Sequence, residues 1–213
     1  MNAQGKATPR KDARSAHRAS LGLRRAKLVC QTGEYLTLIR DVSEQGVGLG
    51  FCHDVPPETR MLLQLSNDLT YPVERVWTGQ RQAGYRFGAE VCLDEFLRDG
   101  AAQSRPLRLQ FSAPVELGIG RAHIAARLLD LSCEGAKISS AARLDEGHLM
   151  TIAIEGLPLQ LGQVRWSQGK RHGIKFQHPI NSEELARCAL RHQPFGKTRS
   201  SGFARLLAKA RAA

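Results

Sequence analysis

Apolar and polar residues alternate in short runs along most of the chain, and turn-forming residues separate these runs. In the first half, for example, two apolar-rich runs flank Thr32-Gly33-Glu34, and Pro56-Pro57 interrupts the pattern further on. Short alternating runs between turn signals are typical of strands in small antiparallel barrels. The pattern predicts strands over residues 27–31, 35–40, 47–51, 61–65, 71–77 and 84–91.

The second half repeats the first. Residues 41–46 read DxSxxG, and residues 130–135 read DxSxxG again, 89 positions later. Without a gap, the same offset relates Trp77 to Trp166, Gly84 to Gly173 and Phe87 to Phe176. A repeat of this length indicates two copies of one small domain. We place them at residues 10–99 and 103–192.

Each copy ends in a short helical pattern. In residues 181–190, Asn181 or Ser182 can cap a helix, and Leu185, Cys188 and Ala189 share one face. The counterpart at residues 93–98 is weaker. The predicted fold is therefore all-β, with two small six-stranded antiparallel barrels in tandem, each followed by a short α-helix.

Charge is concentrated at the two ends. The 213 residues carry a net charge of +11, yet residues 28–194 sum to −1. Residues 1–27 hold eight Lys and Arg against one acid, and residues 195–213 hold five against none. We expect residues 1–9 to be a flexible basic arm and residues 193–213 a basic amphipathic tail. In that tail Phe203, Leu206, Leu207 and Ala210 recur at helical spacing.

Sequence motifs favour a protein without catalytic, metal or cofactor chemistry. The chain lacks GxSxG, GxxxxGK[ST] and HExxH, and its five cysteines form no CxxC pair. It also has no run of about 18 apolar residues and no apolar stretch after its charged N-terminus. We therefore expect a cytoplasmic protein that is not an enzyme and binds no metal.

An arginine pair precedes the first DxSxxG motif. Arg14-Ser-Ala-His-Arg18 has the spacing RxxxR, and Arg10 and Arg14 have the same spacing, which leaves two registers open. An RxxxR segment, a strand, DxSxxG, a strand ending in Trp and a short GxxF strand together resemble the PilZ domain. The resemblance covers nearly the whole chain, twice. It implies a six-stranded barrel that acts as a receptor for cyclic di-GMP.

The ligand's chemistry is consistent with the residues that the resemblance assigns. Cyclic di-GMP has two phosphates and two guanines, and the arginine fork pairs with a phosphate or with the O6 and N7 acceptors of guanine. An ionised Asp accepts from the guanine N–H groups, Ser offers a hydroxyl, and Gly suits a turn that needs positive φ or close backbone approach. The implied ligand residues are Arg14, Arg18, Asp41, Ser43 and Gly46, with Arg10 and a stacking His17 as weaker candidates.

Plainer interpretations stay open for the same residues. DxSxxG between two apolar runs also describes an ordinary turn, and a basic N-terminal segment is often a solvated tail. In addition, Trp77 and Trp166 occupy equivalent positions, and we expect both rings to pack in the barrels, with an exposed stacking platform as the less favoured alternative.

The second copy departs from the ligand-binding pattern. Adding 89 to Arg14 and Arg18 gives Gln103 and Leu107, and the nearby Arg105 and Arg108 are spaced RxxR. We therefore expect a degenerate domain without RxxxR, in which the DxSxxG residues serve the turn more than a ligand. These weaker ligand candidates are Asp130, Ser132 and Gly135.

The sequence thus favours a non-enzymatic cyclic di-GMP effector, with the ligand ordering the arginine arm and rearranging the two barrels. The resemblance implies bacterial motility or biofilm regulation through a protein partner that no residue identifies. One alternative is a ligand-independent interaction scaffold, and a less favoured one is a nucleic-acid binder that uses the basic arms. The tail allows contact with an anionic membrane surface or a partner groove, or is frayed.

Overall fold

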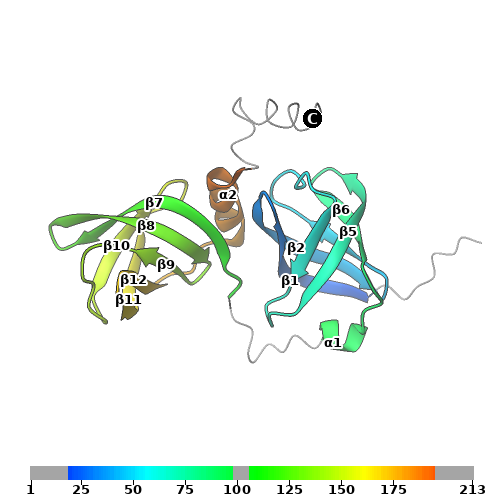
Figure 1. Ribbon diagram of the computed structural model, residues 1–213, viewed down its shortest axis with the longest axis horizontal. Coiled ribbons are helices and arrows are strands. Elements are labelled where there is room, and N and C mark those ends of the chain that lie inside the picture. The colour runs from blue at the N-terminus through cyan, green and yellow to red at the C-terminus, as the bar shows by residue number, and fades with distance from the viewer. Residues whose placement is uncertain (1–18, 98–105, 195–213) are drawn as a thin grey trace, which may run out of the picture.

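The computed structural model describes residues 19–97 and 106–194, which form two closed six-stranded barrels (Figure 1). The first barrel has the strand order β1-β2-β3-β6-β5-β4, and every neighbouring pair is antiparallel. Its elements are β1 (Ala19–Cys30), β2 (Gly33–Ser43), β3 (Gly46–Gly50), β4 (Arg60–Gln64), β5 (Thr70–Gly79), β6 (Gln82–Phe87) and the helix α1 (Leu93–Leu97).

The second barrel has the same architecture, in the order β10-β11-β12-β9-β8-β7. Its elements are β7 (Leu109–Ile119), β8 (Ala122–Ser132), β9 (Gly135–Ser139), β10 (Leu149–Ile154), β11 (Gln160–Gln168), β12 (Arg171–Phe176) and the helix α2 (Ser182–His192). The predicted fold class is confirmed: two tandem six-stranded barrels, each followed by a short helix. No helix within residues 19–97 and 106–194 is long and apolar enough to cross a membrane.

Alternation along the strands explains the two cores. In β7, for example, Leu109, Phe111, Ala113, Val115 and Leu117 are buried, and the residues that alternate with them are exposed. Side chains in a strand point to opposite faces with a period of two, so one face lines the barrel and the other contacts solvent. His53 is one of the few buried polar residues of the first barrel, and burial lowers its pKa.

Helix α2 lies between the two barrels (Figure 1). Asn181 caps it by accepting a hydrogen bond from the backbone N–H of Glu183 at 2.8 Å, as the sequence allowed. The helix contacts β7 of its own barrel and β2 of the first barrel. Leu36, on β2, belongs to the hydrophobic cluster of the second barrel. The helix of one barrel thus packs both barrels together.

A buried ion pair completes this junction. Lys27 Nζ lies 2.8 Å from Glu34 Oε2, and the two side chains are 8% and 13% exposed. Lys27 Nζ also donates to the backbone carbonyl of Arg108 at 2.9 Å, and the backbone N–H of Gln110 donates to Glu34 Oε2 at 2.9 Å. Gln193, just after α2, hydrogen bonds to the backbone N–H and carbonyl of Glu34. Both charged side chains therefore bond to the first residues of the second barrel.

We predict that Lys27→Met destabilises the protein strongly, because it leaves the Glu34 carboxylate buried without its cation. Breaking a buried pair on one side costs about 3 to 5 kcal/mol. Arg60→Met is the matched control, since Arg60 pairs with Glu74 at 3.6 Å while 84% exposed, and exposed pairs contribute about 1 kcal/mol or less. Chemical denaturation of the full chain measures both variants. Equal losses from the two substitutions would show that the junction pair has no special role.

Candidate functional site

The first DxSxxG motif forms the hairpin between β2 and β3. Asp41 pairs with Gly48 and Ser43 with Gly46, and the Ser43 hydroxyl lies 3.4 Å from the Gly46 carbonyl. A Cβ at Gly46 would lie 2.6 Å from the backbone oxygen of Tyr85. Close approach between β3 and β6 therefore requires glycine here, and positive φ is not the reason.

Two further glycines, Gly48 on β3 and Gly84 on β6, allow side chains of neighbouring strands to lie across them. A Cβ at Gly48 would lie 2.5 Å from Asp41 Oδ2, and a Cβ at Gly84 would lie 2.0 Å from Trp77 Nε1. The Asp41 carboxylate and the Trp77 indole each lie across a neighbouring strand because that strand has no side chain at the crossing point. The offset of 89 matches Gly84 to Gly173, but no motif in the sequence indicates that Gly48 or Gly84 belongs to the site.

Trp77 lies on the surface, so the prediction that it packs inside the barrel is wrong. Its side chain is 49% exposed, and the adjacent Val76 is 66% exposed. Trp166 is also partly exposed, and it covers Gly173 as Trp77 covers Gly84. A register shift between Arg75 and Trp77 in the pairing of β5 with β6 accompanies this placement. A bulge of this kind changes the direction in which a side chain points.

These residues surround a pocket of about 520 Å³. It is lined by the two motif residues Asp41 and Ser43, by Gln45, Gly46, Val47 and Gly48, and across the hairpin by Val76, Trp77, Gly84, Tyr85 and Arg86. Burial raises the pKa of Tyr85, so its phenol stays neutral at physiological pH. The pocket combines a carboxylate, a hydroxyl, a cation and an exposed aromatic face, and its volume suits a small-molecule ligand.

The arginine candidates of the first copy lie outside the described residues. These are Arg14 and Arg18, together with the weaker candidates Arg10 and His17. The strand that follows them is described, however. β1 begins at Ala19, directly after Arg18 in the sequence, and Ser20 pairs with Asp41. The chain therefore enters the first barrel beside the DxSxxG hairpin.

In the second barrel the equivalent aspartate is held by ion pairs. Asp130 is 4% exposed, and its Oδ1 lies 2.7 Å from Arg108 Nη1 while its Oδ2 lies 3.0 Å from Lys137 Nζ. Ser132 Oγ donates to the Gly135 carbonyl at 3.1 Å and accepts from the backbone N–H of Glu134 at 3.3 Å. Ser132 thus bonds within the turn, whereas Asp130 bonds to Arg108 and Lys137 outside it.

Strand register corrects the comparison of the two arginine segments. Ser20 pairs with Asp41 and Arg24 with Ile39, whereas Gln110 pairs with Asp130 and Ala113 with Leu128. Between these two pairs, β1 advances by four residues and β7 by three, so β1 contains one extra residue. Before this bulge, equivalent residues of the two barrels are therefore 90 positions apart instead of 89. The counterpart of Arg18 is therefore Arg108, and that of Arg14 is Ser104. The second copy keeps one arginine of the pair, where simple addition of 89 indicated none.

Residues 102–191 match the family model described as the PilZ domain. The second barrel is thus identified as a PilZ domain, and the first barrel repeats its strand order and its DxSxxG hairpin.

Solved structures similar to this chain include two complexes with c-di-GMP. One is the PlzA protein of Borreliella burgdorferi, at 14% identity and a TM-score of 0.36, with 78% of this chain and 87% of that chain covered. Another is YcgR from Escherichia coli, at 14% identity and a TM-score of 0.29, with 88% of each chain covered. The PilZ domain of CeSA from a cellulose-synthesizing bacterium is 20% identical, with a TM-score of 0.30, 40% of this chain and 92% of that chain covered. No curated protein matches the chain.

A second, more charged pocket lies where the two barrels meet. It has a volume of about 420 Å³, and its lining includes Lys27, Glu34, Arg108, Asp130 and Lys137. The basic and acidic groups named here already pair with one another across it. Within the described residues, no cluster of three or more His, Cys, Asp and Glu is placed to hold a metal ion.

We predict that Gly84→Ala displaces the indole of Trp77 and disrupts the pocket, because the new methyl group would lie 2.0 Å from Nε1. In a Trp166→Phe background Trp77 is the remaining tryptophan, so its fluorescence emission reports the change directly. We expect a shift to longer wavelength. Gly88→Ala is the control, since its Cβ would lie 3.4 Å from Pro72 Cβ, an acceptable contact. An unchanged spectrum in Gly84→Ala would contradict the close packing of the ring on β6.

Proposed function

We propose that this protein is a non-enzymatic effector that binds cyclic di-GMP at the first barrel. The observation that carries the proposal is the pocket between Asp41, Ser43 and Trp77, which lies where the RxxxR segment leads into β1. The PilZ match of residues 102–191 and the repetition of that barrel's strand order in the first barrel support the choice of ligand. Residues 10–99 and 103–192 stay the proposed domain bounds.

Each part of the ligand has a matching group in this proposal. Arg14 and Arg18 pair with phosphate oxygens or with the O6 and N7 edge of guanine. Asp41 accepts from guanine N–H groups, and the exposed face of Trp77 offers a surface on which a base stacks. Gly46 and Gly48 keep the hairpin free of side chains so that the ligand approaches the backbone.

The second barrel supplies a comparison for one of these contacts. There Arg108, the counterpart of Arg18, reaches the DxSxxG aspartate at 2.7 Å. Arg18 is thus the arginine that we expect nearest to Asp41, where it would position a ligand group between the arm and the hairpin. Because Ser104 replaces the first arginine in the second copy, we propose no ligand there.

Strand β1 connects the proposed site to the junction between barrels. Its N-terminal end pairs with the hairpin through Ser20 and Asp41, and Lys27, further along the same strand, bonds to Glu34 and Arg108. We propose that ordering of the arm by the ligand shifts β1 and so changes how the two barrels meet. The ligand can shift the equilibrium between two arrangements of the barrels only as far as its affinity for the two arrangements differs. The output is an interaction with a protein partner in motility or biofilm control.

Calorimetric titration of the full chain with cyclic di-GMP tests the proposal. Arg14→Ala and Arg18→Ala should each weaken binding by roughly tenfold to a hundredfold, the range expected for loss of a charge-assisted hydrogen bond. Arg199→Ala removes the same charge from the other basic arm and should leave the affinity unchanged.

Three results would contradict the proposal. Absence of binding by the wild-type chain would favour a ligand-independent scaffold. Binding that survives Arg14→Ala and Arg18→Ala but is lost in Arg108→Ala would place the site in the second barrel. Absence of nucleotide binding together with DNA binding that weakens steeply with salt would favour the nucleic-acid alternative.

A further inference from the structure

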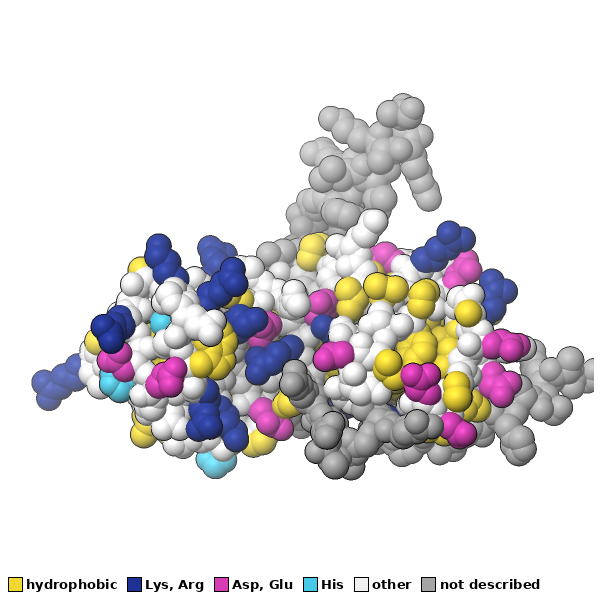
Figure 2. Space-filling view, turned by 60° about the horizontal axis from the view of Figure 1, so that its bottom comes forward, with side chains coloured by type: hydrophobic (Ala, Val, Ile, Leu, Met, Phe, Trp, Pro, Cys, Tyr) yellow, Lys and Arg dark blue, Asp and Glu magenta, His cyan; other side chains and the backbone are white. Residues whose placement is uncertain are grey.

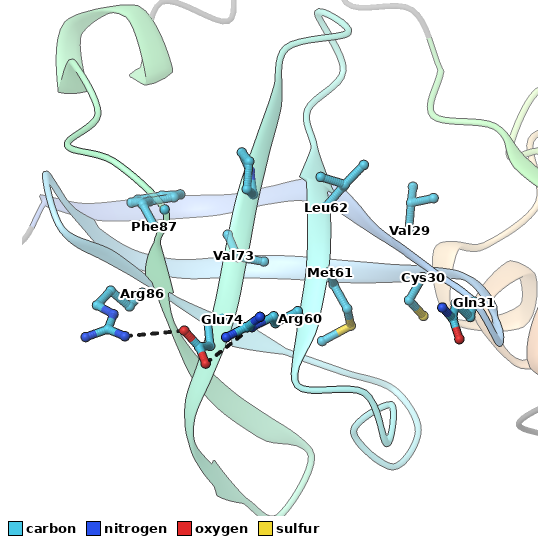
Figure 3. Close-up of a pocket in the computed structure, with 12 residues that line it drawn as sticks. Val29, Cys30, Gln31, Arg60, Met61, Leu62, Val73, Glu74, Arg86 and Phe87 are labelled. Carbon is cyan, nitrogen blue, oxygen red and sulfur yellow. Dashed lines mark hydrogen bonds and ion pairs between the residues drawn. The ribbon is translucent and has the colours of Figure 1, made fainter. Parts of the chain in front are cut away.

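The first barrel carries a large groove that the proposed ligand site does not use. Its volume is about 660 Å³, and it crosses the outer faces of β1, β4, β5 and β6 (Figure 3). Its apolar members include Val29, Leu62, Pro72 and Phe87. Leu62 is 43% exposed, which is unusual for a large apolar side chain in mid-strand. Apolar surface of this kind marks a docking site more often than ordinary surface.

Polar groups line one side of this groove in a row. Glu74 lies between Arg60 and Arg86, 3.6 Å and 3.3 Å away (Figure 3). The register places these three residues side by side on β4, β5 and β6. Val29, Leu62 and Pro72 form the adjacent row on β1, β4 and β5. The groove thus presents an apolar strip beside a charged one, the pattern that an amphipathic helix recognises.

The chain itself contains a segment with the matching pattern. Phe203, Leu206, Leu207 and Ala210 recur at the spacing of one helical face, and Arg205 and Lys209 lie off that face. A helix this short is marginal in water without a surface to pack against. Its apolar side chains therefore need a partner surface for the helix to be stable.

The described chain ends close to the groove. Gln193 hydrogen bonds to the backbone of Glu34, and its side chain lies against Gly33. Gln31, two residues from Gly33, lines the groove. The eight residues 195–202 span up to about 26 Å when extended, and four strands span about 15 Å. Phe203 can thus reach every part of the groove.

The net charge of the described residues favours the first barrel over the second as the docking surface for a basic tail. Residues 19–97 hold eight Lys and Arg against ten Asp and Glu, whereas residues 106–194 hold eleven against eight. The tail at residues 195–213 holds five basic residues and no acid. Figure 2 shows hydrophobic side chains gathered on the first barrel among acidic ones, and more Lys and Arg on the second. A basic tail is therefore attracted to the first barrel.

We propose that the C-terminal segment Phe203–Ala210 docks as an amphipathic helix in the groove of β1, β4, β5 and β6 of its own first barrel. The apolar face covers Val29, Leu62 and Pro72. Arg205 and Lys209 lie off that face, on the solvent side of the docked helix. This contact does not depend on cyclic di-GMP, although Arg86 lines both the groove and the candidate ligand pocket.

Amide hydrogen exchange of the full chain, without ligand, tests the docking. In the wild type, amides of residues 203–210 should exchange at least about tenfold more slowly than those of an unstructured chain. Leu62→Asp should remove this protection, because it puts a charge in the apolar strip. Leu62 is partly exposed, so the substitution leaves the core intact. Leu149→Asp is the matched control, since Leu149 is 56% exposed on β10 of the second barrel.

Other outcomes would overturn the proposal. Unprotected tail amides in the wild type would show that the segment is not docked. Protection lost in Leu149→Asp but kept in Leu62→Asp would place it on the second barrel. Protection that disappears on dilution would identify a second copy of the chain as its partner, and protection that appears only with anionic vesicles would identify a membrane surface.

Discussion

The ion pair between Lys27 and Glu34 lies on two strands of the first barrel where it meets the second, and its bonds to Arg108 and Gln110 link the two barrels. Both charges are removed from water, and each is bonded again by a backbone group at the start of the second barrel. A buried pair is costly to separate because either partner alone would remain desolvated. The pair itself lies within the first barrel, so it is its bonds to Arg108 and Gln110 that favour one relative position of the barrels. Helix α2 reinforces that position by packing on β2 and β7.

The two barrels use one hairpin motif in different ways. In the second barrel, Arg108 and Lys137 neutralise the buried Asp130, so its oxygens are already bonded within the protein. In the first barrel, Asp41 lines an open pocket beside an exposed tryptophan. The same motif thus forms an ion-paired hairpin in the second barrel and part of an open pocket in the first. Since the Arg108 carbonyl also accepts a hydrogen bond from Lys27, the second barrel is bonded to the strand that leads from the pocket.

The sequence was sufficient for the fold because each barrel has strong local signals. Alternating runs, turn residues and the 89-residue offset predicted the strands and the closing helices, and buried residues such as Leu109 to Leu117 follow that alternation. The hairpin glycines Gly46 and Gly135 were also predictable, because close backbone approach leaves a glycine in each copy.

Features that depend on pairing between strands were not predictable. One extra residue between Ser20 and Arg24 shifts the register of β1. A constant offset of 89 therefore does not match Arg18 to Arg108. Trp77 is a large aromatic residue of the kind that usually packs in a core. Its place on the outer surface of the barrel depends on the bulge in β5 and on the absence of a side chain at Gly84. Lys27 and Glu34 form no recognisable motif, because their partners belong to the other barrel.

The central claim is that cyclic di-GMP binds at the first DxSxxG hairpin. Nuclear magnetic resonance titration of the isotopically labelled full chain tests it most directly. The account predicts that the largest shifts fall on the amides of residues 43–48 and on the indole N–H of Trp77, with small shifts at residues 132–135. Shifts centred on residues 132–135, or none at all at saturating nucleotide, would contradict it.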